Sequence, residues 1–390
     1  MKKIISLFAI LLSSLIILSG CNDNDTANSN IMISVYLEGT DDNKSIEIYN
    51  NSLEEIKLNN YSIGIFKIGN KETPNINIKL SGILEAKKCY VISNDKANSD
   101  ILAKTNLKTA DLSFGGIEGV ALMYKDTVLD VIGSIGLRNQ NSNITLVRKV
   151  DCTTPSTTFD QYNYLRYGLD NANYLGEFKN SVTPEELLQG PKFDKSYLDL
   201  PFYTTTPGLL GTGGALEVEL FQNVDGDTAY FVFPDSVNIG SLVAKNNTIT
   251  KNGVVAAKVR YQDIDTPESY SGNIQEFGLV AKKYTSDLQT NADKIYVQTI
   301  KNDGLLCTYG RLMGYVFVEK DNDTTLVNFE VIKHGYSTIG FQYNEDMLYK
   351  DLPYYSYFLN AQLYAQKNKL GLYGEKDPNW DYKNNKSLYD

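Results

Sequence analysis

Short hydrophobic runs separated by Asn, Asp and Gly dominate residues 31–176 of the chain. Residues 45–49 alternate between polar and apolar side chains, and Gly115-Gly116 is one of several turn signals between such runs. Short strands at regular spacing, with turn signals between them, predict an antiparallel β-sandwich. Further strand candidates lie at residues 33–37, 90–92, 120–124, 128–132 and 145–147.

The pattern changes beyond residue 214, where strand-like runs are joined by segments of helical periodicity. Apolar residues recur at helical spacing in 276–290, 327–334 and 359–370, and a glycine follows each of the last two segments, as is common at helix ends. Helices that fold onto a preceding set of strands predict an α+β domain. Its strand candidates are residues 216–224, 228–233, 258–261, 295–300 and 312–318.

Proline and glycine are concentrated between these two regions. Four prolines fall within residues 184–207, and four glycines fall within residues 208–214. This composition is typical of a connecting segment. The sequence therefore predicts a β-sandwich at residues 31–178, a linker at 179–214 and a second domain from residue 215, with the two domains folding independently.

The N-terminus has the features of a targeting signal. Two lysines precede an apolar run at residues 4–18, which is short for a membrane span of roughly 20 residues and fits a secretory signal peptide. The run ends in Leu-Ser-Gly-Cys, which resembles the bacterial lipobox and marks residues 1–21 as a lipoprotein signal region. The resemblance implies that Cys21 is diacylated and then becomes the N-terminus after cleavage. Residues 22–30 then form a polar tether. We expect a lipid-anchored protein at the extracellular face of the cell membrane.

Composition narrows the chemistry available to the chain. His334 is the single histidine of 390 residues, so catalytic triads and His-rich zinc sites are nearly excluded. The four cysteines have no CxxC spacing, which argues against a Cys-only zinc site. Cys89 and Cys152 are equally compatible with a disulfide across the sandwich and with two separate thiols. Catalysis must therefore come from carboxylates, Arg, Lys, Tyr or an oxygen-bound metal.

Charge gives a weaker constraint. The formal net charge is −10, so a generally basic protein that coats nucleic acids is unlikely, while a local binding site stays open.

Several motifs follow one another in the first domain, at Glu38-Gly39, 44–50, 58–61, Ser81-Gly82, 114–116, 130–133 and 145–149. Their order resembles the lamin-tail domain. This resemblance implies an immunoglobulin-like sandwich at residues 31–178 with a spacer or binding role and an unknown partner.

Four segments of the second domain are unusual in combination. They are Val-Asp-Gly-Asp-Thr at 224–228, the stretch 259–268, Tyr-Gly-Arg at 309–311 and the helix opening at 327–328. Each has an ordinary explanation by itself, because Asp-Gly-Asp forms β-turns, Asp-Thr-Pro-Glu starts helices and a single Arg often forms a surface ion pair. The chemical complementarity of their side chains favours a shared site.

These side chains supply what metal-assisted phosphodiester hydrolysis requires. Asp227, Asp265 and a backbone carbonyl offer the hard oxygen ligands that Ca²⁺ prefers. Arg260 and Arg311 offer planar forks that suit a phosphodiester and its transition-state charge. Glu268 offers a carboxylate that can position or deprotonate a water molecule. The set therefore predicts hydrolysis without a histidine.

From residue 216 to residue 373 these motifs and the order of elements resemble the thermonuclease, or staphylococcal-nuclease-like, family. The resemblance implies an OB-type β-barrel with helices at residues 215–374, followed by a C-terminal tail at 375–390. It implies a micrococcal-nuclease-type endonuclease that cleaves DNA and RNA with Ca²⁺ and leaves 3′-phosphate products. The implied roles are metal ligation by Asp227, Asp265 and the Thr266 carbonyl, catalysis by Arg260, Glu268 and Arg311, and substrate binding by Tyr309, Phe341 and Tyr343.

The sequence departs from the family pattern in three ways. Cys307 replaces an acidic residue three positions before the glycine of Tyr-Gly-Arg. The segment between Asp227 and Arg260 is longer than usual, and residues 238–252 are predicted to form an extended hairpin or loop. The domain also contains more acidic than basic residues, which predicts weak non-specific attraction to polyanions.

The sequence supports one leading hypothesis and two alternatives. The leading hypothesis is a membrane-anchored extracellular Ca²⁺-dependent nuclease whose substrate is DNA, RNA or both. One alternative is a surface protein that binds nucleic acid with little catalytic activity, although all five catalytic and metal-binding side chains are present. The other is an adhesion protein in which the sandwich carries the function.

Overall fold

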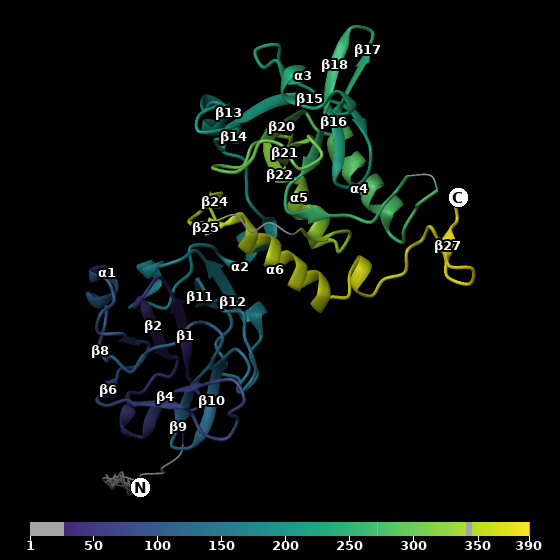
Figure 1. Cartoon of the computed structure of the whole chain (residues 1–390). Coiled ribbons are helices and arrows are strands. Elements are labelled where there is room, and N and C mark those ends of the chain that lie inside the picture. The colour runs from purple at the N-terminus through teal and green to yellow at the C-terminus, as the bar shows by residue number, and fades with distance from the viewer. Residues whose placement is uncertain (1–26, 271, 341–344, 390) are drawn as a thin grey trace, which may run out of the picture.

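The computed structural model describes residues 27–270, 272–340 and 345–389, which form two lobes with helix α6 (Tyr354–Lys367) between them (Figure 1). The predicted signal peptide and the lipidation site at Cys21 lie outside the described residues. Among the residues that are described, no helix is long and apolar enough to cross a bilayer.

The N-terminal lobe is built from two antiparallel sheets, apart from one short parallel pairing, and it confirms the predicted β-rich region. One sheet has the order β12-β11-β1-β2-β7-β8 and the other has the order β10-β9-β4-β5. The first sheet comprises β1 (Ile31–Glu38), β2 (Lys44–Asn50), β7 (Cys89–Ser93), β8 (Leu107–Lys108), β11 (Ile144–Arg148) and β12 (Tyr164–Tyr167). The second comprises β4 (Tyr61–Phe66), β5 (Ile76–Lys79), β9 (Gly119–Tyr124) and β10 (Thr127–Ile132).

Side chains from both sheets form a common hydrophobic core. Ile33 and Ile46 of one sheet and Ile63 and Leu122 of the other belong to the same fully buried cluster. The alternation that predicted the strands places these residues on the inward faces, where their burial stabilises the sandwich. Cys89 and Cys152 are free thiols, so the disulfide alternative is absent from the structure.

The C-terminal lobe contains a closed five-stranded barrel. β18 pairs with β16 on one side and with β21 on the other, so that β18, β16, β15, β20 and β21 form a ring. Closure removes the exposed edges of the sheet. The strands are β15 (Ala215–Asn223), β16 (Thr228–Val232), β18 (Val254–Tyr261), β20 (Lys294–Gln298) and β21 (Leu312–Lys320), and β17 (Thr248–Lys251) and β22 (Asp323–Leu326) extend the sheet.

Three helices accompany the barrel: α4 (Gly278–Thr290), α5 (Val327–Lys333) and α6. The first two agree with the predicted segments. Helix α6 begins at Tyr354, earlier than the predicted residue 359, because Pro353 introduces a first turn whose Tyr354, Tyr357 and Phe358 are buried. The long segment after β16, predicted as a hairpin or loop at 238–252, contains the short helix α3 (Ile239–Leu242) and then β17, which pairs with the start of β18 in a hairpin.

The segment predicted as a linker packs against the barrel. It contains α2 (Pro184–Gln189), whose residue Leu187 is buried in a hydrophobic cluster that spans both lobes, with Leu165 of the sandwich and Phe317 of the barrel among its members. Phe193 stacks on Tyr296 with ring centroids 4.2 Å apart. The sandwich also contacts α6 directly, because the Ser356 hydroxyl donates a hydrogen bond to the Arg166 carbonyl. The segment between the lobes is therefore structured.

Candidate active site

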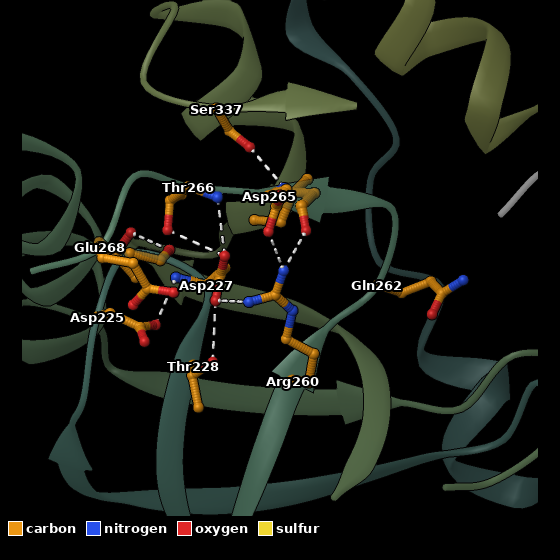
Figure 2. Close-up of polar contacts among 12 residues, drawn as sticks. Asp225, Asp227, Thr228, Arg260, Gln262, Asp265, Thr266, Glu268 and Ser337 are labelled. Atoms are coloured by element: carbon orange, nitrogen blue, oxygen red, sulfur yellow. Dashed lines mark hydrogen bonds and ion pairs between the residues drawn. The ribbon is translucent and has the colours of Figure 1, made fainter. Parts of the chain in front are cut away.

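Asp227 is the buried centre of the candidate site. It ends the turn between β15 and β16, and only 1% of its surface is exposed. Its Oδ2 accepts hydrogen bonds from the Thr266 amide at 2.8 Å and hydroxyl at 3.0 Å, and its Oδ1 accepts one from the Thr228 hydroxyl at 2.9 Å (Figure 2). A Cβ at Gly226 would lie 2.8 Å from the Ala281 side chain, so glycine is needed for this turn to approach α4.

Arg260 bridges two of the predicted metal ligands. It lies opposite Thr228 in the β16–β18 ladder, which directs its guanidinium toward Asp227. Nη1 contacts Asp227, and Nη2 donates to Asp265 at 2.6 Å and to the Ile264 carbonyl at 3.0 Å (Figure 2). Burial alone would lower the pKa of Arg260, but the two carboxylates raise it. The site therefore holds a permanent positive charge between two carboxylates.

Asp265 is the solvent-facing member of this group. It lies in β19 (Ile264–Asp265), which pairs with β23 (Thr338–Ile339), and its amide donates to the Ser337 hydroxyl at 3.0 Å. These bonds fix its backbone, while 52% of its side chain is exposed. Asp265 is therefore accessible to a ligand, in contrast to Asp227.

The sequence prediction assigned no role to Asp225, although it belongs to the same Asp-x-Asp turn. Its Oδ1 accepts a hydrogen bond from the Asp227 amide at 3.1 Å. Burial, together with the charge of Asp227, raises the pKa of Asp225 to about 7. Asp225 therefore carries less negative charge near neutral pH than an ordinary aspartate.

Arg311 and Tyr309 lie on a tight turn after β20. Within this turn the Cys307 amide donates to the Arg311 carbonyl at 2.9 Å, and Gly310 has a positive φ of 69° that favours glycine. The Arg311 guanidinium lies over the Tyr309 ring, 5.5 Å from its centroid, and 76% of Tyr309 is exposed. The turn therefore presents a cation and an aromatic face together.

The long insertion braces this turn. Asn247 is buried, and its Nδ2 donates to the Tyr309 carbonyl at 2.8 Å. The Ala244 amide donates to the Gly310 carbonyl at 3.3 Å. The sequence marked the insertion as a departure, but it offered no signal that a buried Asn would hold the Tyr-Gly-Arg turn.

A cavity of about 260 Å³ joins the two halves of the site. Arg260 and Asp265 line one part of it, and Tyr309 and Arg311 line another. Cys307 also lines it. Burial opposes ionisation of this thiol, but hydrogen bonds with Arg311 lower its pKa overall, so Cys307 ionises more easily than an ordinary cysteine.

Glu268 lies on a separate loop. Its amide donates to Gln275 Oε1 at 3.0 Å, and its carbonyl accepts from the Gln275 amide at 2.9 Å. Glu268 does not line the cavity, and in Figure 2 it lies on the other side of Asp227 from Arg260. Two further predicted site residues, Phe341 and Tyr343, lie outside the described residues.

The oxygen donors at this site fit a hard cation. Asp227 and Asp265 meet at one guanidinium, and Thr266 follows Asp265 directly in the chain. Asp265 is exposed, whereas Asp227 is buried and hydrogen-bonded, so a cation would have to displace Arg260 to reach both carboxylates. Within the described ranges, no three acidic, cysteine or histidine side chains cluster closely enough to form a metal site by themselves. Water would have to complete the coordination of Ca²⁺, which takes six to eight oxygen ligands.

Comparison with known proteins identifies the class of the C-terminal domain. Residues 258–375 match the sequence model of the family described as Staphylococcal nuclease homologue, so the chain carries a staphylococcal-nuclease-type domain. The match contains Arg260, Asp265, Glu268 and Arg311, whereas Asp227 lies before it. An uncharacterized protein of Methanocaldococcus jannaschii is 26% identical over 183 residues, which cover 42% of this chain and 70% of that protein.

Proposed function

We propose that the protein is a Ca²⁺-dependent nuclease that hydrolyses phosphodiester bonds of DNA and RNA and leaves 3′-phosphate ends. One observation carries the proposal: Arg260 joins Asp227 and Asp265 beside a cavity that Arg311 also lines, within a nuclease-type domain. Two acidic ligands and two guanidinium forks form a donor set for a metal and a phosphate together.

The proposed roles follow from burial and position. Asp227, Asp265 and the Thr266 carbonyl would hold Ca²⁺, which supplies charge stabilisation at a phosphoryl oxygen. Arg311 would bind the phosphate within the cavity, and Arg260 would exchange part of its contact with the carboxylates for the phosphate oxygens. Glu268, which lies outside the cavity in this structure, would accept the proton of the attacking water as the water oxygen bonds to phosphorus and the P–O5′ bond breaks. The leaving 5′-oxygen would take a proton from solvent and become the 5′-hydroxyl.

Cleavage assays on the chain from residue 31 onward test this function. We expect loss of intact DNA and RNA in Ca²⁺ and full protection in EDTA, with 3′-phosphate ends on the products. Asp227→Ala should abolish cleavage, whereas Asp235→Ala, at an exposed position beyond β16, should leave it unchanged. Binding without cleavage by the wild-type protein would favour the nucleic-acid-binding alternative.

We further propose that the nuclease acts at the extracellular face of a cell membrane, anchored through lipid on Cys21. The Leu-Ser-Gly-Cys motif after a short apolar run supports this proposal. Cys21→Ser should leave the chain unprocessed or move it from the membrane fraction to the medium. Unchanged processing and membrane association in this variant would contradict the anchor.

A further inference from the structure

Helix α4 contacts both the loop that carries Glu268, the proposed base, and the turn that ends at the buried Asp227. Its first turn lies on the loop of Glu268, because a Cβ at Gly278 would be 2.0 Å from the Glu268 carbonyl oxygen. Farther along the helix, the Thr285 hydroxyl donates to the Gly226 carbonyl at 2.9 Å. The position of α4 therefore affects both the Glu268 loop and the turn that ends at Asp227.

The start of α4 lacks a capping side chain of its own. Phe277 occupies the N-cap position with a positive φ of 66°, makes no side-chain cap, and is followed by no acidic residue in the first turn. A left-handed conformation is costly for a bulky residue, so other contacts must hold it. An N-terminus of this kind favours a nearby carboxylate, which can accept from its amides and interact with the helix dipole.

The C-terminal segment supplies that carboxylate. Asp377 is 3% exposed, and its Oδ2 accepts a hydrogen bond from the Phe277 amide. Its Oδ1 accepts from the Asn379 amide at 2.7 Å, and its own amide donates to the Tyr382 hydroxyl at 2.6 Å. Tyr382 in turn donates to Glu276, so the segment binds two consecutive residues before α4.

A short hairpin presents these groups to the helix. Strand β26 (Trp380–Asp381) pairs with β27 (Lys386–Ser387), and the hairpin lies at the end of the chain next to the loop before α4 (Figure 1). Asp377 follows the matched nuclease segment, which ends at residue 375. The support for the Glu268 loop therefore comes from a part of the chain outside that match.

We propose that Asp377 is a positioning residue for Glu268, acting by capping α4 and fixing the backbone on which the Glu268 loop lies. This role rests on the proposed nuclease function. Asp377 binds the Phe277 amide, and the next residue, Gly278, packs against the Glu268 carbonyl. Two hydrogen bonds between Glu268 and Gln275 hold the other side of the loop. Asp377 itself touches neither the cavity nor the predicted metal ligands.

The test compares Asp377→Ala with Asp377→Asn in the full chain. The alanine variant should lower kcat roughly 10- to 100-fold with little change in KM, because a displacement of about 1 Å near the reacting groups costs up to about 10²-fold. It should also speed amide hydrogen exchange at residues 277–281. The asparagine variant keeps an oxygen acceptor, so it should stay within about 3-fold of wild type in both measurements.

Asp381→Ala is the matched control. Asp381 lies in the hairpin that follows Asp377, and its side chain binds the turn at 383–384, so its loss should leave kcat and exchange at 277–281 unchanged. If Asp377→Ala fails to fold, Tyr382→Phe replaces it, because that variant removes the hydroxyl that joins Asp377 to Glu276. It should lower kcat several-fold and speed exchange at residues 276–278.

The two measurements separate this role from the proposed function. Unchanged exchange at 277–281 in Asp377→Ala would overturn the positioning role whether or not the protein cleaves nucleic acid. Equal losses in Asp377→Ala and Asp377→Asn would also overturn it, because both capping and loop support need only the acceptor. An inactive wild-type protein with faster exchange in Asp377→Ala would retain the capping and overturn the nuclease function alone.

Discussion

The two lobes contain the same pair of side chains in opposite settings. In the sandwich, Arg148 and Asp130 are each 1% exposed and bound on all sides, with Arg148 Nε donating to the Ile33 carbonyl at 2.7 Å. Asp130 also accepts from the Ile33 amide at 2.8 Å and the Ser156 amide at 2.9 Å. In the barrel, Arg260 is 23% exposed and binds one buried carboxylate, Asp227, and one exposed carboxylate.

This difference shows why an Arg–Asp pair is not itself a sign of function. Burial raises the pKa of Asp130 although Arg148 acts in the opposite direction, so the sandwich pair carries a desolvation cost that its hydrogen bonds offset. Arg260 keeps an open side toward a cavity, and one of its partners, Asp265, faces solvent. A pair that can exchange partners with a ligand can take part in chemistry, whereas an enclosed pair can only stabilise a fold.

The largest expected effect is the difference in nuclease activity between variants of Asp227 and of Asp130. Asp227→Ala removes the buried carboxylate that binds Arg260, so it should abolish Ca²⁺-dependent cleavage, with partial rescue by excess Ca²⁺. Asp130→Ala should leave kcat unchanged at 25 °C in the fraction that is folded. Cleavage rates measured on folded protein, with circular dichroism as the control for folding, test the contrast. Equal activity in both variants would remove the distinction.

Glu268→Gln tests whether the site formed by Arg260, Asp227 and Asp265 acts together with a general base. The amide keeps the size of the side chain and removes its basic carboxylate, so kcat should fall about 10²- to 10⁴-fold while calcium affinity changes little. Single-turnover rates and calorimetric calcium titration measure the two quantities. Near-normal cleavage in this variant would leave the metal assignment intact and show that the base assignment is wrong.

The loss of unfolding free energy should follow the opposite order to the loss of activity: it should be large for the sandwich aspartate and small for an aspartate of the candidate site. Asp130→Ala leaves Arg148 buried without its partner, which costs about 3–5 kcal/mol of unfolding free energy. Asp265→Ala should cost at most about 1 kcal/mol, because exposed ion pairs contribute little. Urea unfolding monitored by circular dichroism gives both values. A larger loss of unfolding free energy in Asp265→Ala than in Asp130→Ala would mean that the ion pair between Arg260 and Asp265 also stabilises the fold.

Arg311→Ala should reduce kcat by about 10²- to 10³-fold, the typical effect of losing one donor that stabilises transition-state charge. Its unfolding free energy should change much less than that of Arg148→Ala, because Arg311 lines the cavity whereas Arg148 is enclosed. Steady-state kinetics beside denaturant titration measure the two effects. A stability loss equal to that of Arg148→Ala would place Arg311 among the structural residues.

Much of this contrast could be predicted from the sequence. Periodicity located the strands and helices, and the complementary chemistry of four separate segments brought Asp227, Arg260 and Asp265 into one group. The element predictions agree with the structure because strand and helix periodicity leaves local patterns, and the structure brings these three side chains together, while their roles in metal and phosphate binding stay predictions. The position of Glu268 outside the cavity was not predictable, because the loop path is set by contacts with Gln275 and the start of α4.

Contacts between residues far apart in the sequence left no such local pattern. Asp377 caps a helix 100 residues earlier in the chain, and Asn247 holds the carbonyl of Tyr309, yet both residues look like ordinary surface polar residues in the sequence. Arg148 equally gave no sign that it would be fully buried. Burial of a single polar side chain depends on tertiary packing, so only the structure distinguishes these residues from exposed ones.

The smallest expected effect concerns whether damage in one lobe reaches the other. The sequence predicts independent domains, and the side chains of the enclosed pair bind groups of the sandwich at Ile33, Thr154, Ser156 and Tyr164. Outside the sandwich, Asn180 of the segment at 179–214 donates to the Arg148 carbonyl. We therefore expect Asp130→Ala to lower the thermal transition of the sandwich and to shift that of the barrel by less than about 2 °C, which corresponds to under about 0.5 kcal/mol for a domain of this size. Scanning calorimetry and residual nuclease activity measured between the two transitions test this expectation. Loss of activity together with the sandwich would show instead that α6 and the packed segment at 179–214 couple the lobes, since Ser356 and the buried Leu187 connect them through these elements.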